Sequence, residues 1–482
     1  MSSTHALPSR PNVVWIMTDE QRCDSIGCYG SGWARTRRLD RLARRSITFD
    51  SAYTPSPVCV PARVAMLTGY RPSTCGVYTI HDPLPPERAR FLTQNFTDAG
   101  YQTATFGKQH YNSAGPEAFE HESFRIVGDR VKPLGYVDPA DEAGADVVQY
   151  PGEDASSRWV LAGRLPGTID DMPEARVVED ARAWLGSRDP QRPFFLRVSF
   201  NGPHTPVVAP APYDTQTDPD AIDLPIDRYP GAEPTLPPTL HRALVHRSGT
   251  HRLSDAQVRR ARQVYYGLVS ALDALVGRML DTIAELGLER DTVVAFCSDH
   301  GAHLGDHGFF QKQSFFEASA RVPLILYDPR AESFCGSRVT RPVSTGSLLP
   351  TLLTLCGLAV PEDVDYPVLP GTSVGSSETP GCPVVSEIAY GERGGRGHDR
   401  YVMLRDGRWK LTVFKDRDDP DRLPAYDGLM LFDLLNDPHE RRDLAPRIDQ
   451  DPAVRDTVKG LLDELARIDG HDAPRATPAA FA

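Results

Sequence analysis

The feature that most limits what this chain can fold into is an alternation of short apolar segments with helical patterns over roughly the first 370 residues. The apolar segments are short and rich in β-branched and aromatic residues, which is typical of buried strands. They cover residues 13–17, 102–106, 194–200, 292–297 and 322–327. Helical patterns lie near 175–186 and 348–358, and the capping-box pair Ser254 and Gln257 opens a third that reaches about residue 286. This order predicts an α/β fold with helices on both faces of the sheet.

The last hundred residues have a different pattern. A stretch rich in Gly, Ser and Pro at 371–383 indicates a boundary. Beyond it we expect short antiparallel strands at 384–389, 401–404, 409–414 and 429–434, and a closing helix near 452–468. We therefore predict an α/β domain over residues 10–372 and a smaller C-terminal α+β subdomain over 384–470. The segments 112–190 and 206–250 are interpreted as irregular, apart from the helix near 175–186.

Composition excludes several classes of protein. Hydrophobic residues make up 40% and charged residues 24%, which is ordinary for a globular protein and excludes a disordered chain or a membrane bundle. The net charge of −12 makes nucleic acid an unfavourable partner. No apolar run approaches the roughly 20 residues that span a bilayer, and the run at 13–17 is too short for a signal peptide. The eight cysteines form no CxxC pair, so we expect free thiols and a cytoplasmic location. From the short apolar runs we expect no membrane partner.

Four polar side chains directly follow predicted strands. Asp19, Lys108, His204 and Asp299 each lie just beyond the carboxyl end of one of the apolar segments. In open α/β sheets, ligands bind beyond the carboxyl ends of the strands. Polar residues also follow strands simply because loops are polar, but the chemical types of these four favour a shared cleft.

Cys59 directly precedes a helical pattern that starts with Pro61. Backbone N–H groups and the helix dipole favour an anion at such a position. Arg63, four residues further on, falls on the same face of the helix. This arrangement indicates a nucleophile beside an anion site; the alternative is a buried structural cysteine with a surface arginine.

Three carboxylates and an imidazole form a candidate metal site, namely Asp19, Glu20, Asp299 and His300. Oxygen-rich sets of this kind suit hard divalent cations such as calcium, magnesium or manganese. The alternative for the aspartates is turn capping.

Cys59-Val-Pro-Ala-Arg63, followed by Leu67-Thr68-Gly69, resembles the signature of the sulfatase family, the formylglycine-dependent type I sulfatases of the alkaline phosphatase superfamily. The resemblance extends over nearly the whole chain, in motifs around Asp19, Lys108, His204, Asp299 and Lys312 and in the segments 431–434 and 436–440. It implies an alkaline phosphatase-like fold, with a large mixed, mostly parallel sheet and helices on both faces, and hydrolysis of sulfate esters, as in an arylsulfatase. Family members often have Asp-Asp where this chain has Asp19 and Glu20, and asparagine where it has His300. The first departure puts ligation by Glu20 in doubt, and the second favours manganese over calcium.

The resemblance also implies a mechanism. A formylglycine-generating enzyme oxidises Cys59 to Cα-formylglycine, whose hydrate is the nucleophile and also a metal ligand. Arg63 and the metal hold its attacking hydroxyl, and Lys108, His204 and Lys312 bind the sulfate oxygens. His204 or Lys312 protonates the departing alcohol. His110 then takes the proton of the second hydroxyl, and the hemiacetal expels sulfate.

Lysine usage supports two of these roles. The chain has 47 arginines and only six lysines, yet the family positions Lys108 and Lys312 are both lysine. A compact ammonium with three donors is therefore specified at these two positions.

Other candidates have simpler explanations. We expect His303 and His307 to stabilise a loop, although they could line the mouth of the cleft, and we expect Cys23, Cys28 and Cys75 to be small buried residues. A basic cluster could meet an anionic sugar but is more simply a solvated face; it comprises His241, Arg242, His246, Arg247, His251 and Arg252.

Three alternatives to a sulfatase remain. A phosphonate or phosphate ester hydrolase of the same superfamily would typically carry tyrosine and threonine where this chain has Lys108 and His110. An unmodified cysteine hydrolase leaves the acidic metal set unexplained. A non-catalytic binding protein on this scaffold leaves every filled catalytic position without a purpose. The expected substrate is a small-molecule or carbohydrate sulfate ester.

Overall fold

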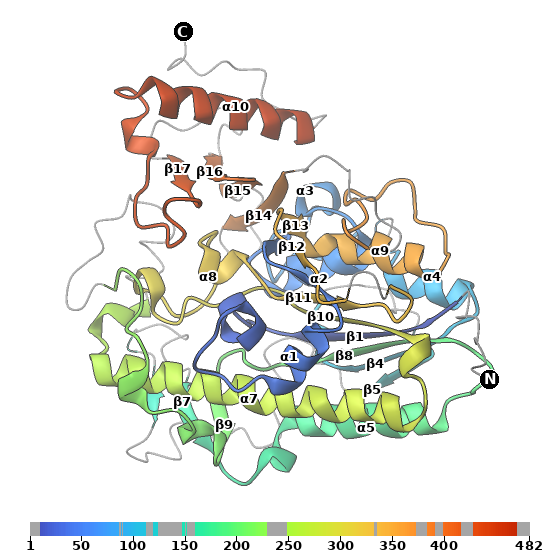
Figure 1. Ribbon diagram of the computed structural model, residues 1–482. Coiled ribbons are helices and arrows are strands. Elements are labelled where there is room, and N and C mark those ends of the chain that lie inside the picture. Colours follow the sequence, from blue (N-terminus) through green and yellow to red (C-terminus); the bar gives the residue numbers. More distant parts are fainter. Residues whose placement is uncertain are drawn as a thin grey trace.

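The computed structural model describes residues 10–85, 88, 90–111, 119–123, 147–149, 151, 160–228, 248–331, 335–372, 383–390, 399–415 and 428–469. Its centre is an eight-stranded sheet of order β12-β2-β11-β10-β1-β8-β4-β5 (Figure 1). In chain order these strands are β1 (Asn12–Thr18), β2 (Ile47–Phe49), β4 (Gln102–Gly107), β5 (His121–Ser123), β8 (Phe194–Ser199), β10 (Thr292–Ser298), β11 (Leu324–Tyr327) and β12 (Arg338–Val339). All five strands predicted for this part of the chain are present.

The middle of the sheet is parallel. β10, β1, β8 and β4 are adjacent and run in the same direction, so their carboxyl ends meet at one edge of the sheet. β11 pairs with β10 in the antiparallel direction. The sheet is therefore mixed and mostly parallel, as the sequence predicts.

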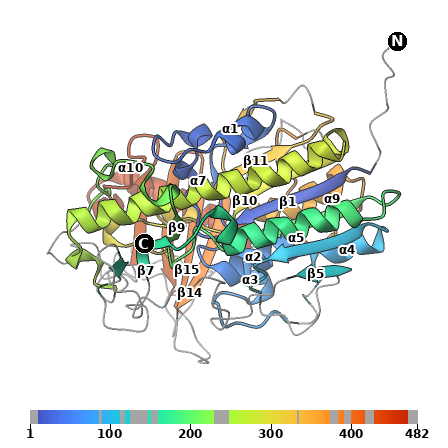
Figure 2. The ribbon, with the colours of Figure 1, turned by 90° about the horizontal axis from the view of Figure 1, so that it is seen from below.

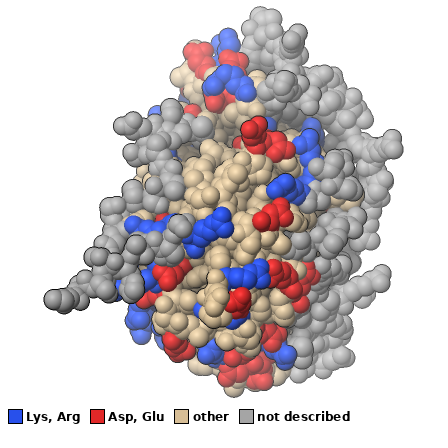
Figure 3. All heavy atoms as spheres, turned by 90° about the vertical axis from the view of Figure 1, so that its right-hand side faces the viewer, with Lys and Arg blue, Asp and Glu red and all other residues tan. Residues whose placement is uncertain are grey.

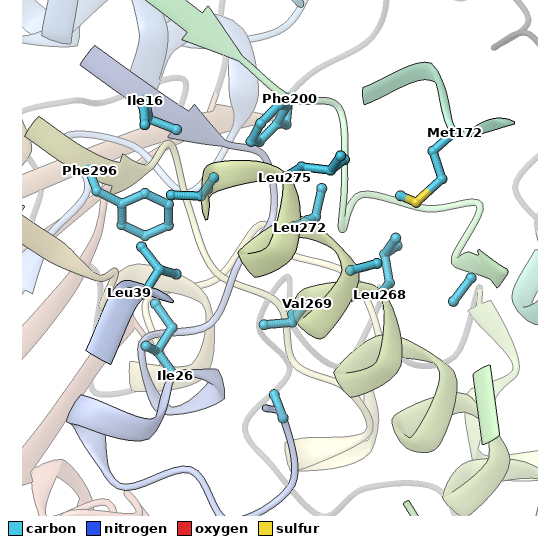
Figure 4. Close-up of a cluster of buried hydrophobic side chains, with 14 of the residues drawn as sticks. Ile16, Ile26, Leu39, Met172, Phe200, Leu268, Val269, Leu272, Leu275 and Phe296 are labelled. Carbon is cyan, nitrogen blue, oxygen red and sulfur yellow. The ribbon is translucent and has the colours of Figure 1, made fainter. Parts of the chain in front are cut away.

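Helices cover both faces of the sheet. Side chains of β1 alternate between them, because successive residues of a strand point to opposite sides. Val14 and Ile16 pack towards α1 (Arg37–Ala43), α5 (Pro173–Ser187) and α7 (Asp255–Glu285). Figure 2 shows α5 and α7 lying across the sheet, and Figure 4 shows Ile16 and Phe296 in the same buried cluster as Leu272 and Leu275 of α7. Val13, Trp15 and Met17 pack towards α2 (Cys59–Thr68), α4 (Leu92–Asp98) and α9 (Leu348–Leu355).

A separate four-stranded antiparallel sheet follows in the C-terminal part. Its strands β14 (Val384–Tyr390), β15 (Asp399–Asp406), β16 (Trp409–Lys415) and β17 (Leu429–Asp433) pair in sequence order. α10 (Pro452–Asp469) packs against it through Val458, Leu461 and Leu465 (Figure 1). These elements lie where the sequence predicts them. The placement of a domain boundary between 372 and 384 stays a prediction.

Some smaller elements differ from the expectation. The segment expected to be irregular contains β6 (Val148–Gln149) and β7 (Val160–Leu165), which form a three-stranded sheet with β9 (Val208–Pro210). β7 escapes detection because Gly163 and Arg164 interrupt its apolar pattern. α2 begins at Cys59 rather than at Pro61; a proline is tolerated there because N–H groups of the first turn have no partner inside the helix. Within the described residues, the remaining short strands and α-helices are β3 (Ala52–Tyr53), β13 (Val343–Ser344), α3 (Pro72–Cys75) and α8 (Glu317–Ala320).

The surface and the helices give two further facts. Acidic and basic side chains are interspersed over the face of the molecule that Figure 3 shows. Among the described residues, no helix combines the length and apolar character that crossing a bilayer requires.

Candidate active site

Four loops meet at the carboxyl edge of the parallel strands. Asp19 follows β1, Lys108 follows β4, Asp299 follows β10, and His204 lies five residues beyond β8. Asp19, Lys108 and Asp299 are buried, and His204 is mostly buried. The structure thus brings together four side chains that are up to 280 residues apart in the sequence.

Cys59 lies in the first turn of α2 and points into this group. Its Sγ is 3.1 Å from Nε2 of His300 and 3.7 Å from Oδ1 of Asp19. His300 faces Cys59 through Nε2 because its Nδ1 is held 3.0 Å from the carbonyl oxygen of Gly301. Burial and Asp19 oppose ionisation, but Lys312, Lys108 and His300 outweigh them and hold the pKa of the Cys59 thiol well below its usual value.

Arg63, one turn further along α2, joins the two aspartates. Its Nη2 donates to Oδ2 of Asp19 at 2.9 Å, and its Nε donates to Oδ2 of Asp299 at 2.8 Å. Its Nη1 donates to the carbonyl oxygen of Lys108 and to Oγ of Ser199. The guanidinium is fully buried and fixes both carboxylates in place.

The atoms that Arg63 leaves open form a candidate metal centre. Asp19, Asp299, His300 and Cys59 each offer one ligand atom to a group in which these atoms lie within 4.8 Å of one another. Nε2 of His300 is 3.8 Å from Oδ1 of Asp19 and 3.7 Å from Oδ1 of Asp299. Arg63 binds Oδ2 of both aspartates and so orients their other oxygens. This arrangement fits a divalent metal, because metal sites rely on such hydrogen-bond partners to orient their carboxylate ligands.

Glu20 belongs to a second, overlapping group with Asp19 and His204. Its Oε2 accepts a hydrogen bond from Nζ of Lys312 at 2.9 Å and lies 3.5 Å from Nε2 of His204. The backbone of Glu20 is left-handed, with φ of 64°, which is uncommon for a residue other than glycine. The hydroxyl of Tyr265 donates to the carbonyl oxygen of Glu20 at 2.8 Å and helps hold this conformation.

The two remaining site residues also lie around Cys59. Nζ of Lys108 is 2.7 Å from Oδ2 of Asp19. His110 has a left-handed backbone, with φ of 43°, and its buried Nδ1 has no hydrogen-bond partner within the described part of the chain. Burial lowers the pKa of His110, although a hydrogen bond and charge from Cys59 act in the opposite direction. A neutral imidazole beside residue 59 can accept a proton.

Burial and mutual charge perturb the metal-site side chains as well. Burial and the neighbouring charge of Asp19 raise the pKa of Asp299 to about 7. Burial alone would raise the pKa of Asp19, but Lys108, His204 and Arg63 hold it well below its usual value. Burial alone would lower the pKa of His300, but the charges of Asp299 and Cys59 raise it to about 9. Such clustered shifts are common at functional sites.

The structure also places the secondary candidates. His303 is buried, with Nδ1 3.0 Å from the carbonyl oxygen of Asp306 and Nε2 2.6 Å from Oγ of Ser314, so it stabilises a loop. His307 stacks on Phe316 with ring centroids 4.0 Å apart. Cys23 and Cys75 are buried and Cys28 is half-buried, and burial raises the pKa of each thiol to about 12. Of the basic cluster, His241, Arg242, His246 and Arg247 lie outside the described residues, whereas His251 is half-buried and Arg252 is exposed.

Sequence reasoning missed two residues that shape the site. Ser199 ends a buried strand, and Tyr265 occupies an ordinary core position of a long amphipathic helix. Neither belongs to a recognisable motif, so only the fold reveals their contacts with Arg63 and Glu20.

Comparison with solved structures supports the fold. A phosphonate monoester hydrolase from Silicibacter pomeroyi is 24% identical, covers 97% of this chain and 96% of its own, and superposes with a TM-score of 0.79. A protein solved in complex with its substrate D-glucosamine-2-N,6-O-disulfate is 19% identical, covers 97% and 99%, and gives a TM-score of 0.73.

Comparison with known sequences identifies the family. A choline-sulfatase from Rhizobium meliloti (strain 1021) is 30% identical over 90% of this chain and 82% of its own length. An arylsulfatase from Clostridium perfringens (strain 13 / Type A) is 28% identical over 95% and 94%. The sulfatase family model matches residues 11–358, which include Cys59 and all of its neighbours in the site. The chain therefore belongs to the sulfatase family of hydrolases.

Proposed function

We propose that this protein hydrolyses sulfate esters with a Cα-formylglycine hydrate at position 59 and a divalent metal ion. One observation carries the proposal: the side chain of Cys59 points into a buried group of metal-ligand atoms that is itself surrounded by cations. The cations are Arg63, Lys108 and Lys312. A sulfate ester is an anion, so a nucleophile in these surroundings is well placed to meet it.

Asp19, Asp299, His300 and residue 59 would hold the metal, with Glu20 as the fifth candidate ligand. The oxygen-rich set favours calcium or manganese, with magnesium as a further option. When bound, the metal would neutralise substrate charge and polarise an oxygen at the reacting centre.

The other side chains would bind sulfate and move protons. Lys108, Lys312 and His204 would bind the sulfate oxygens while a hydroxyl of residue 59 forms a bond to sulfur and the bond from sulfur to the alcohol oxygen breaks. Nε2 of His204 or Nζ of Lys312 would supply the proton that the departing alcohol needs. His110, kept neutral by burial, would take the proton of the second hydroxyl as the carbon–oxygen bond to sulfate breaks. This elimination restores the aldehyde at position 59, and water hydrates it again.

The nucleophile can be tested directly. The protein would be produced with a formylglycine-generating enzyme, the maturation partner that we propose, and the peptide containing residue 59 analysed by mass spectrometry. We expect an aldehyde in place of the thiol, and no turnover by Cys59→Ala. Full activity in protein that carries only the unmodified thiol would overturn the formylglycine mechanism.

Phosphonate or phosphate ester hydrolysis is the second candidate, and the similarity in fold to a phosphonate monoester hydrolase favours it. Lys108 and His110 argue for sulfate, because members of the phosphonate branch typically carry tyrosine and threonine there. The assay compares kcat/KM for an aryl sulfate with that for the matching phosphonate ester. A preference for the phosphonate would overturn the sulfatase assignment but leave the nucleophile in place.

The proposed substrate class is a small-molecule or carbohydrate sulfate ester. Relatives of this chain include a choline-sulfatase and an ulvan-active sulfatase, so a panel of choline, aryl and carbohydrate sulfates is the appropriate screen. We propose a cytoplasmic location from the free thiols that the cysteine pattern predicts.

A further inference from the structure

The loop that carries Lys312, residues 310–317, lies against the C-terminal sheet. Phe316 packs with Met430 and Phe432 of β17, and Phe315 belongs to a buried cluster with Ile388 and Met403. The C-terminal sheet is thus in direct contact with a segment that reaches the candidate active site.

Lys410 of β16 makes the most specific contacts across this boundary. Its ammonium is fully buried and donates to the carbonyl oxygen of Phe315 at 2.7 Å and to Oε1 of Glu317 at 2.9 Å. It also pairs with Oε1 of Glu440, whose Oε2 accepts a hydrogen bond from the backbone N–H of Glu317 at 2.6 Å. The ammonium therefore makes two hydrogen bonds to the loop and an ion pair with Glu440, and Lys410 and Glu440 together hold the backbone at residues 315 and 317.

A buried charge is a costly way to attach one sheet to a loop. Removing an ammonium from water costs several kcal/mol, and well-packed apolar residues would often stabilise such a contact equally well. What the ion cluster supplies is direction, because an ammonium held between a carbonyl oxygen and two carboxylates in fixed positions defines where the loop backbone must lie.

The other side of the loop is fixed by the catalytic domain. The N–H of Gln313 donates to the carbonyl oxygen of Pro57 at 3.1 Å, and Oγ of Ser314 lies 2.6 Å from Nε2 of His303. Lys312 thus projects from a backbone that is held on both sides. Its Nζ donates a hydrogen bond to Oε2 of Glu20 at 2.9 Å. A small cavity lined by Ser314, Phe315, Phe316, Lys410 and Glu440 lies beside the loop.

We propose that Lys410 is a positioning residue for Lys312, so that the C-terminal sheet contributes to the reaction by fixing the 310–317 loop. This inference rests on the role that the proposed function gives to Lys312. It also gives a purpose to Glu440, the last residue of the 436–440 segment.

The test is a double-mutant cycle with Lys410→Met and Lys312→Ala, assayed on the full-length modified protein with an activated aryl sulfate. We expect Lys410→Met to lower kcat/KM by about 10- to 100-fold, since a misplacement of about 1 Å can cost about 100-fold. In the Lys312→Ala background, the same substitution should have little further effect, because residues that act through one another are not additive.

Controls separate positioning from general damage. Formylglycine content, metal content and the unfolding temperature are measured for each variant. Met430→Leu is the control at the same boundary, because Met430 packs on Phe316 but pairs across the sheet with Thr412 rather than with Lys410. If Lys410→Met does not fold, Lys410→Arg takes its place in the cycle, because it keeps the buried charge but moves the donors.

The outcomes distinguish this inference from the proposed function. Full activity of Lys312→Ala would overturn the role of Lys312 and with it the basis of the inference. A large effect of Lys312→Ala, combined with an equally large effect of Lys410→Met in both backgrounds, would overturn the inference alone. An unchanged kcat/KM in folded Lys410→Met would do the same.

Discussion

Arg63→Met is the substitution whose effect on stability follows most directly from the structure. Arg63 is fully buried and is the shared cation of two fully buried carboxylates, Asp19 and Asp299. Methionine keeps much of the apolar bulk of the side chain but removes the charge and all four hydrogen bonds that the guanidinium donates.

The expected loss is about 3–5 kcal/mol in the free energy of unfolding of the metal-free protein, the usual cost of removing one partner from a buried ion pair. Native proteins are stable by only about 5–15 kcal/mol, so the denaturant midpoint should fall markedly. Arg192→Met is the control at the surface, because Arg192 pairs with Glu120 at 2.8 Å and donates to the carbonyl oxygens of Gly100 and Tyr101, but both charged side chains are about 40% exposed. Such surface pairs contribute at most about 1 kcal/mol.

The loss should also depend on pH. Burial would raise the pKa of Asp19, but Lys108, His204 and Arg63 together hold it below its usual value. The ionised form of Asp19 therefore stabilises the wild-type fold above about pH 4. This contribution to the free energy of unfolding is lost as the pH falls further. Asp19 keeps Lys108 and His204 when Arg63 is removed, but the pKa of Asp299, which burial and Asp19 already raise to about 7, should rise further, so that protonation relieves its ionised form below neutral pH. Urea unfolding of both proteins at pH 7 and pH 5 should therefore show a smaller difference at pH 5. An Arg63→Met loss no larger than that of Arg192→Met would refute this account of the site.

Three further predictions concern the same site. His110→Ala should accumulate a sulfated residue 59 and turn over slowly, because sulfate transfer to residue 59 does not need His110 whereas the elimination of sulfate does. Intact-protein mass spectrometry after brief incubation with an aryl sulfate measures the added sulfate. Absence of the added mass would contradict this role of His110. Asp19→Ala and Asp299→Ala should lose bound metal and turnover while the circular dichroism spectrum stays unchanged; full activity of thoroughly chelated wild-type protein would contradict the metal requirement. Tyr265→Phe should cost about 1–3 kcal/mol, measured by urea unfolding, because it removes the acceptor for the buried N–H of Arg22 as well as the donor to Glu20; a loss below about 0.5 kcal/mol would show that water replaces the hydroxyl.

The central sheet could be predicted because its strands are buried on both faces. Such strands are continuous apolar runs, so β1, β8 and β10 stand out in the sequence. β7 does not, since Gly163 and Arg164 interrupt its pattern and its partners β6 and β9 lie in separate parts of the chain. Its formation depends on tertiary pairing, which a local pattern does not encode.

The candidate site divides in the same way. The placement of Asp19, Lys108 and Asp299 could be anticipated because each directly follows a strand of the parallel sheet. Ser199 and Tyr265 could not, because they act through contacts with residues 136 and 245 positions away in the sequence. Their residue types are equally common in ordinary core positions, so no local signal marks them.

The rarity of lysine is a further signal in the sequence, and it includes a buried residue outside the family motifs. Only six lysines stand beside 47 arginines, and three of the six, Lys108, Lys312 and Lys410, are buried in or beside the site. Arg63 donates four hydrogen bonds, two of them to the carboxylates that it bridges, and an ammonium has only three protons to donate. Lys410 meets a carbonyl oxygen and two carboxylates in different directions, for which a compact ammonium with three donors is better suited. Lys459, in contrast, is exposed on α10. The rarity of lysine therefore narrows the search for a buried cation to six positions, and the fold is needed to select Lys410 from them.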